Sequence, residues 1–419
     1  MNKLRLLPLI LLVSSCSFFI EKLDTKLVDE KDYRENMPSA ETFCPVDKKQ
    51  NLQIVGTNAA AQSIFSDLSK NRSLDFLDNF AIWSLAQFSI RPDQSSPTAR
   101  LQVLMNVQGK SQYFDFFSEA PEDQYPYLYG IEWILKKFGK KTTLEQYGRI
   151  VEEAFSGKIP ADKDLENFFR KNKEAIKGTP ELATHFFRGN EVLKENEKIP
   201  SLNYSELIAS FRKIQKKQKV VINTTLSPFS TPQGHEGRCN YDFNLYNNSI
   251  FLIDKSIPDA NLYGVSQDQH SFLSATSQRM DQLSSLNGYP LFKGVSKVRS
   301  SAVCVIENDG QKIWTVSNQS RDPGQHLFHL VRYGIARAQT TLEVDKLIRH
   351  SRHLFLSDPV RLIIESHRSR PDQIENLLKL NLPIYNAEKL GNIWAYTFFK
   401  GQSRFVVDER NPGAFSCTP

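Results

Sequence analysis

The sequence lacks the short motifs by which many enzymes are recognised. Its 419 residues contain no GxSxG nucleophile elbow, no SxxK with its partner motifs and no glycine-rich phosphate loop after a predicted strand. Cysteine is scarce, and none of the five stands in a CxxC pair, which argues against a zinc site. His350 and His353 are three residues apart but belong to no HExxH motif. We therefore expect neither a metal nor a cofactor.

Long apolar runs are also absent, apart from one near the start. The run from Leu4 to Val13 follows two basic residues and covers about ten residues, whereas a helix needs about twenty to cross a bilayer. It ends in Val13-Ser14-Ser15-Cys16. A charged start, a short apolar run and small residues at the end are typical of a cleaved export signal.

Residues 1–17 resemble the signal of bacterial lipoproteins, because the small residues before Cys16 match a lipobox. The resemblance implies that residues 1–15 are removed and that Cys16 carries the lipid, including palmitate, that holds the protein in a membrane. Ser17 stands where an aspartate would favour the inner membrane, so we expect the periplasmic face of the outer membrane. The alternative is an ordinary secretory signal in which Cys16 plays no part.

The charge of the chain is nearly balanced. Its 53 basic and 47 acidic residues give a formal net charge of +6, which does not indicate nucleic acid. We expect an envelope protein or an anionic envelope ligand as partner instead.

The remaining cysteines suit an oxidising compartment. Cys44, Cys239, Cys304 and Cys417 are even in number and allow three disulfide pairings, among which the sequence does not choose. Cys304 could equally be a small buried apolar residue of the run 301–306.

The spacing of apolar residues predicts an α+β protein in several parts. Residues 1–15 form the signal, residues 16–44 a lipid-anchored tether, residues 45–219 an all-helical domain, and residues 220–419 an α/β domain with a mixed or mostly parallel sheet. Helices are expected around 59–69, 74–88, 127–137, 144–155, 165–176 and 207–214, and another opens at Thr179-Pro180-Glu181, with the aromatic cluster 113–133 as helical core.

Turn and cap residues predict the order of strands and helices in residues 220–419. Asn308-Asp309-Gly310 indicates a hairpin between strands, and Lys400-Gly401-Gln402 indicates another. Asp322-Pro323 predicts the start of a helix. Further strands are expected at 219–225, 249–253, 360–365 and 382–385, with helices at 342–353 and 371–380.

Two polar loops of this part are candidates for a site. They follow predicted strands, and ligands gather at the carboxyl ends of strands in open α/β sheets. If the strands are parallel, the loops share one edge and bring together donors for a phosphate or carboxylate. The ligand-binding candidates are Ser320, Arg321, His326, His329, His367, Arg368 and Arg370.

A second resemblance concerns residues 311–415, which look like half of a phospholipase D-type domain. That family carries HxKxxxxD, but the matching positions here are Trp394, Tyr396 and Gly401. His235 and Asp242 have the spacing of the motif's histidine and aspartate, yet Gly237 replaces the lysine. The resemblance therefore implies a scaffold that has lost or changed its chemistry.

Taken together, these patterns predict a lipid-anchored envelope protein with a non-catalytic role in binding or assembly. The alternative is an envelope hydrolase or phosphodiesterase-like enzyme on the degenerate phospholipase D-like scaffold. In that enzyme His326 or His367 would be the base or nucleophile, and Arg321, Arg368 or Arg370 would hold the oxyanion.

Overall fold

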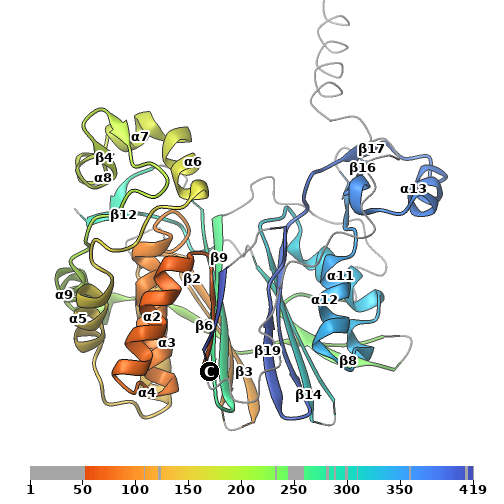
Figure 1. Ribbon diagram of the computed structural model, residues 1–419, viewed down its shortest axis with the longest axis horizontal. Coiled ribbons are helices and arrows are strands. Elements are labelled where there is room, and N and C mark those ends of the chain that lie inside the picture. The colour runs from red at the N-terminus through yellow and green to blue at the C-terminus, as the bar shows by residue number, and fades with distance from the viewer. Residues whose placement is uncertain are drawn as a thin grey trace, which may run out of the picture.

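Two antiparallel β-sheets face one another, and helices cover the outer face of each sheet (Figure 1). The computed structural model describes residues 52–107, 109–120, 124–231, 234–243, 259–279, 283–286, 289–297, 301–308, 310–357, 360–410 and 414–418. The tether, the signal, Cys16 and the strand expected at 249–253 lie outside these residues.

The larger sheet takes its strands from both halves of the chain. Its seven strands are ordered β20-β1-β9-β10-β2-β3-β6, and every neighbouring pair is antiparallel. Their bounds are β20 (Ala414–Thr418), β1 (Leu52–Gly56), β9 (Asp259–Gln267), β10 (His270–Gln278), β2 (Arg100–Val107), β3 (Lys110–Phe117) and β6 (Val221–Asn223).

Helices pack on the outer face of this sheet and form the largest apolar core. Phe114 and Phe116 of β3, for example, contact Trp133 of α4. The helices are α2 (Ala59–Asn71), α3 (Phe76–Ile90), α4 (Pro126–Lys137), α5 (Leu144–Phe155), α6 (Lys163–Lys171), α7 (Lys173–Lys177), α8 (Pro180–Phe186) and α9 (Tyr204–Ile214), followed by the 3-10 turn η2 (Gln215–Lys217). The short strand pairs β4 (Phe187–Arg188) with β5 (Glu191–Val192) and β11 (Ser285–Leu286) with β12 (Tyr289–Phe292) complete this half.

The smaller sheet has six strands in the order β19-β18-β14-β13-β8-β7, again all antiparallel. They are β19 (Gln402–Val406), β18 (Asn392–Phe399), β14 (Gln311–Asn318), β13 (Ala302–Asn308), β8 (Glu236–Cys239) and β7 (Ser227–Ser230). Its outer face is covered by α11 (Pro323–Arg332), η3 (Ile335–Arg337) and α12 (Thr341–Arg349).

A third sheet stands at the end of the sandwich where β14 ends, which is the upper end in Figure 1. It contains β15 (His353–Ser357), β16 (Val360–Ile364) and β17 (Ile384–Asn386), with η4 (Ser366–Arg368) and α13 (Pro371–Leu378) between the last two. β16 and β17 are the one parallel pair among the described strands.

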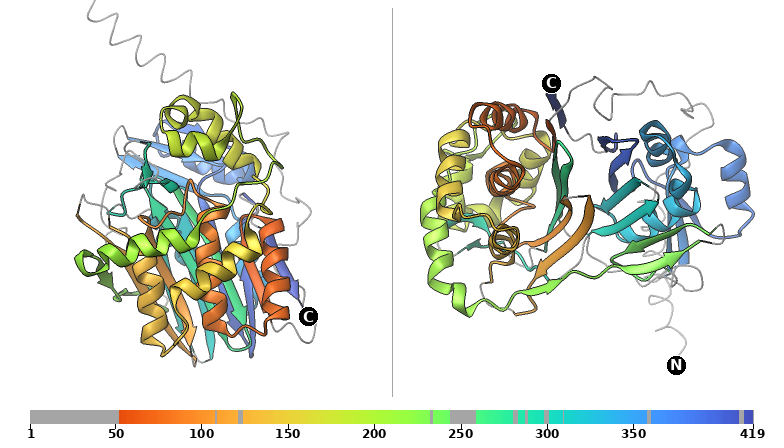
Figure 2. Two further views of the ribbon diagram at one scale, coloured as in Figure 1. Left: turned by 90° about the vertical axis from the view of Figure 1, so that its left-hand side faces the viewer. Right: turned by 90° about the horizontal axis from the view of Figure 1, so that it is seen from below.

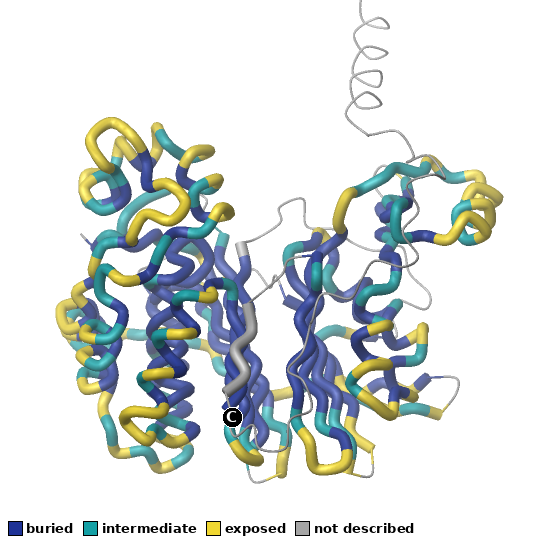
Figure 3. Tube along the Cα trace, viewed as in Figure 1, coloured by how far each residue is buried: buried dark blue, intermediate teal, exposed yellow. Residues whose placement is uncertain are grey.

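The inner faces of the two main sheets bury a continuous apolar layer. Leu104 and Leu262 of the larger sheet belong to one cluster with Trp314, Trp394 and Tyr396 of the smaller sheet. Seen from below, the two sheets lie face to face between the outer helices (Figure 2), and burial is concentrated on the strands (Figure 3). This layer holds the two halves together, because burying apolar surface is the main force that stabilises a fold.

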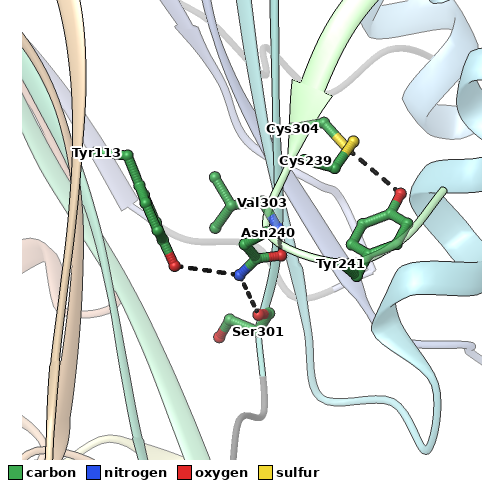
Figure 4. The surroundings of a disulfide bond; sticks show 7 residues. All are labelled: Tyr113, Cys239, Asn240, Tyr241, Ser301, Val303 and Cys304. Atoms are coloured by element: carbon green, nitrogen blue, oxygen red, sulfur yellow. Dashed lines mark hydrogen bonds between the residues drawn. A yellow bond between two sulfur atoms is a disulfide. The ribbon is translucent and has the colours of Figure 1, made fainter. Parts of the chain in front are cut away.

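A disulfide and one amide reinforce the junction between the sheets. Cys239 of β8 is bonded to Cys304 of β13, which selects one of the pairings that the sequence left open (Figure 4). The neighbouring Asn240 donates to the Ser301 carbonyl (3.2 Å) and to the Tyr113 hydroxyl of the larger sheet (3.3 Å). The bridge therefore fixes the strand that carries this contact between the sheets.

The expected fold class is wrong in both parts. Residues 45–219 are not an all-helical domain, because β1, β2 and β3 form there and join the larger sheet. Nor is the second part an α/β domain with a mostly parallel sheet, since both main sheets are antiparallel. The physical reason is that β2 and the stretch Tyr113–Phe116 of β3 are buried on both faces, so their apolar residues do not alternate with polar ones.

Many local predictions are confirmed. Helices occur at each place expected before residue 219, and both predicted hairpins join antiparallel strands. No helix within the described residues combines the length and apolar character needed to cross a bilayer.

Candidate active site

A serine and a histidine form a buried pair at the upper end of the smaller sheet. After β14 ends, Gln319 adopts a positive φ of 53° and turns the chain out of the strand. Asp322 then caps α11 by accepting from the Gln325 N–H. The first turn of this helix brings His326 Nε2 to 2.7 Å from Ser320 Oγ, with the two residues only 2% and 6% exposed.

The loop before β18 closes over this pair. Gly391 has a φ of +63°, and a Cβ atom there would lie 3.0 Å from His326 Cδ2 and 3.1 Å from the Asn318 carbonyl oxygen. A larger residue would be strained and would push against the imidazole. Glycine is therefore needed for His326 to sit between α11 and β18.

Burial sets the protonation state of His326. It lowers the pKa of the imidazole well below its ordinary value, and the positive charge of Arg352 acts in the same direction. His326 is consequently neutral at pH 7, and its Nε2 can accept the Ser320 hydroxyl proton. Its Nδ1 has no hydrogen-bond partner among the described residues. The arrangement is thus a serine–histidine dyad, without the third group that orients the histidine in a triad.

Two more histidines, His329 and His350, line a small cavity beside the dyad, and His353 packs against His329. The rings of His329 and His353 lie 3.9 Å apart, and Tyr333 packs edge-on against His350. Burial lowers the pKa of His329 well below the ordinary value and that of His353 to about 4. No set of three or more His, Cys, Asp and Glu side chains suited to a metal occurs in the part of the chain that the structure describes. The cavity is lined by His326, His329, Leu330, Tyr333, Leu347, His350, Ser351, Arg352 and Ile393.

A buried ion cluster lies next to these histidines. Arg410 binds Glu365 through two hydrogen bonds of 2.7 and 2.6 Å, and Arg352 binds Asp408 at 2.5 Å. Burial alone would raise the pKa of Asp408, but Arg352 and Arg410 outweigh it and hold the pKa below its ordinary value. The remaining oxygens accept backbone N–H groups, including that of Leu390 on Glu365. The cluster ties α12, the third sheet and the end of β19 together.

The structure places the residues that the sequence grouped into one site after strands of two different sheets. Ser320, His326 and His329 lie together, whereas His367, Arg368 and Arg370 follow β16 in the third sheet. The two strands do not belong to one parallel sheet, so that premise of the shared edge is wrong. Arg368 is engaged by Glu409, and Arg370 pairs with Asp372 at the surface. Arg321 is exposed, and His367 is partly buried.

Sequence reasoning missed the amides beside the dyad. Asn318 and Asn392 are direct neighbours on β14 and β18, and they are 0% and 4% exposed. An isolated asparagine at the end of a predicted strand gives no signal, because such residues are common in turns. Only the pairing of the two strands places them together.

Comparison with solved structures shows a shared fold. LmbA2991T421A superposes with a TM-score of 0.69 at 8% identity, over 90% of this chain and 99% of that one. LmbA2991HD gives a TM-score of 0.67 at 8% identity, with the same coverage. Cephalosporin acylase from Bacillus halodurans gives 0.57 at 8% identity, over 92% of this chain and 99% of that one. No family model matches the sequence, and no curated protein matches it significantly.

The chain therefore shares its fold with the LmbA2991 structures and with cephalosporin acylase from Bacillus halodurans. This finding contradicts the expected non-catalytic binding or assembly role, because cephalosporin acylase, which shares the fold, is an enzyme. The phospholipase D-like scaffold, on which the alternative function rested, gains no support. The physical reason for the error is that the fold depends on the pairing of strands far apart in the sequence, such as β1 with β9 and β20, and no short motif reports this pairing.

The ion cluster predicts a large loss of stability when one member is removed. Arg410→Met leaves Glu365 and Asp408 buried without their shared cation, which should lower the free energy of unfolding by about 3–5 kcal/mol. The matched control Arg370→Met removes an exposed pair and should cost less than about 1 kcal/mol. Denaturant unfolding measures both values. Equal small losses would show that the cluster does not hold the third sheet in place.

The buried histidines predict that acid destabilises the fold. The unfolded chain binds protons below about pH 6.5, while the folded chain resists them until the lower pKa values are reached. Stability should therefore be full above pH 6.5 and fall between pH 6.5 and 4. His353→Phe keeps an aromatic ring against His329 and should recover on the order of 2 kcal/mol of the loss.

Thermal unfolding across this pH range tests the histidine prediction, with His235→Phe on the other side of the smaller sheet as control. An unchanged pH dependence in His353→Phe would contradict the assignment.

Proposed function

We propose that this protein is a hydrolase that cleaves an amide bond by acyl transfer, with Ser320 as nucleophile and His326 as general base. The observation that carries the proposal is the 2.7 Å hydrogen bond between Ser320 Oγ and a neutral, buried His326 Nε2. A nucleophile in hydrogen-bond contact with its base is the central geometric feature of acyl-transfer sites. The fold shared with an acylase supports an amide rather than a phosphodiester as substrate.

The chemistry follows from the positions of the two side chains. Ser320 Oγ attacks the carbonyl carbon while its proton moves to His326 Nε2, and His326 returns that proton to the leaving amine as the amide bond breaks. Water then hydrolyses the acyl-serine by the same route. The Asp322 N–H, which donates to Ser320 Oγ at 3.3 Å, is a backbone donor beside the reacting oxygen.

The predicted export signal bears on where in the cell this reaction takes place. We propose that Cys16 is lipidated and that the enzyme acts on the periplasmic side of the outer membrane. Three observations in the sequence support this: the lipobox, the short apolar run and Ser17. An amide-bearing envelope component would then be the natural substrate.

A fluorophosphonate probe tests the catalytic proposal without knowledge of the substrate, because it reacts with activated serines. We expect the probe to label Ser320, as located by peptide mass spectrometry. Ser320→Ala should abolish labelling, and His326→Gln should slow it by about 10²- to 10⁴-fold. Because the pKa of His326 is lowered, the labelling rate should stay constant as the pH falls through 6.5. It should decline only when the pH approaches the lowered pKa of His326.

Ser317→Ala is the matched control for this experiment. Ser317 is the last residue but one of β14, is fully buried and has no hydrogen-bond partner for its hydroxyl within the described ranges. Its loss should leave labelling unchanged. A nucleophile can also be activated by the terminal amine of its own residue, so the intact mass of the protein is measured in parallel. A chain cut in two and labelled at its new terminal residue would disprove the role of Ser320.

The anchor has a separate test. Cells grown with radiolabelled palmitate should yield labelled protein, and Cys16→Ala should yield none. Label that persists in the variant would remove the argument for a lipid at Cys16, without affecting the catalytic proposal.

A further inference from the structure

The upper end of the layer between the two sheets contains hydrogen-bonding groups without protein partners. Both side-chain atoms of Asn318 and the Oδ1 of Asn392 are buried and make no hydrogen bond to any described residue. The indole N–H of Trp394 is also buried and makes no hydrogen bond to any described residue. Each such group costs free energy when buried, so their concentration in one place calls for a functional reason.

These groups share one face of the smaller sheet. Trp314 and Val316 of β14 and Trp394 and Tyr396 of β18 all point into the layer between the sheets. Because side chains alternate along a strand, Asn318 and Asn392 point the same way. They are direct cross-strand partners, which places their Cβ atoms about 5 Å apart.

In the described part of the opposite sheet, β9 and β10 present small side chains at this level, while Arg100 of the next strand, β2, is engaged by Asp115. The Gln319 side chain donates to the Ala260 carbonyl at 3.4 Å, so the end of β14 lies beside the start of β9. Ala260 pairs with Ser277 of β10, and Ala275 lies two residues further along the same face. The Ser277 hydroxyl also has no partner within the described chain. Small residues opposite the asparagines leave the amides facing the inter-sheet layer rather than a bulky side chain.

Among the described residues, the site carries donors and acceptors, and its charged side chains are paired. Asn318 supplies one donor and one acceptor, Trp394 a donor and Asn392 an acceptor. The charged pair on the same face, Arg100 with Asp115, is closed by two hydrogen bonds of 2.7 and 2.6 Å. A carboxylate or phosphate would meet unpaired acceptors here, whereas a neutral peptide group offers one N–H and one C=O in return.

We infer that Asn318 and Asn392 hold a neutral amide group of the substrate next to Ser320. This inference rests on the proposed function and narrows its substrate to compounds with a second, peptide-type amide near the bond that is cut. Asn318 is two residues from Ser320, and its carbonyl contacts the same Gly391 position as His326. Both asparagines are positioning residues, since neither reaches the reacting serine in the dyad.

Two fluorophosphonates of equal length test the inference, one with a peptide amide in its arm and one with an alkyl arm. The ratio of their labelling rates at Ser320 should be about tenfold or more in the wild type. In Asn318→Leu it should fall to about one. The matched control Asn308→Leu, at the exposed end of the neighbouring strand β13, should keep the wild-type ratio. An unchanged ratio in Asn318→Leu would overturn the inference.

Calorimetric binding of N-acetylglycinamide separates this inference from the catalytic proposal, because binding needs no reaction. The wild type and Ser320→Ala should bind it, and Asn318→Leu should not. If no probe labels Ser320 but this pattern of binding is found, the proposed function fails and the amide site stands. Equal binding by Asn318→Leu and the wild type would overturn the site.

The melting temperature provides a third test, because a binding role and a structural role of Asn318 predict opposite changes in it. Leucine in place of an unpartnered buried amide should leave the melting temperature unchanged or raise it. A fall of several degrees would show that Asn318 serves the fold and would count against the inference.

Discussion

The packing of the two sheets against each other is the interaction on which the rest of the structure depends. Tryptophan and leucine side chains from the inner faces fill one apolar layer. In the larger sheet, the first described strand, β1, pairs with both β9 and β20 and so joins β20 to the sheet. The two sheets could not hold this relation through hydrogen bonds alone, since each satisfies its backbone groups internally. Burial of the inner faces therefore fixes where every strand end, and hence every loop of the site, is placed.

At the upper end of that layer, the side chains that β14 points inward change from apolar to polar. Along β14, Trp314 and Val316 are followed by Asn318, and the chain then leaves the sheet through Gln319 toward Ser320. The buried ion cluster of Glu365, Arg410, Arg352 and Asp408 holds the adjoining third sheet against this end. A rigid frame around a few unsatisfied polar groups is the arrangement expected of a site that binds before it reacts, because preorganised groups lose little entropy on binding.

The sequence was sufficient to predict features that depend on neighbouring residues. It was insufficient to predict contacts between residues far apart in the chain. The turn at Asn308 to Gly310 and the cap at Asp322 depend on residues a few positions apart, and both form as predicted. Ser320 and His326 are also close in sequence, so their proximity could be anticipated. The pairing of Leu52 with Gln267 and Thr418, or of Glu365 with Arg410, joins distant residues that carry no mutual signal in one sequence. Helical and strand periodicity also fail where both faces of a strand are buried, as in β2.

A crystal structure of the protein after reaction with the amide-armed fluorophosphonate would test the central claim most directly. The account predicts phosphorus bonded to Ser320 Oγ, His326 Nε2 within hydrogen-bond distance of the adduct, and the amide of the arm hydrogen-bonded to Asn318 and Asn392. Phosphorus on a different residue, or an unmodified Ser320 still bonded to His326, would contradict it.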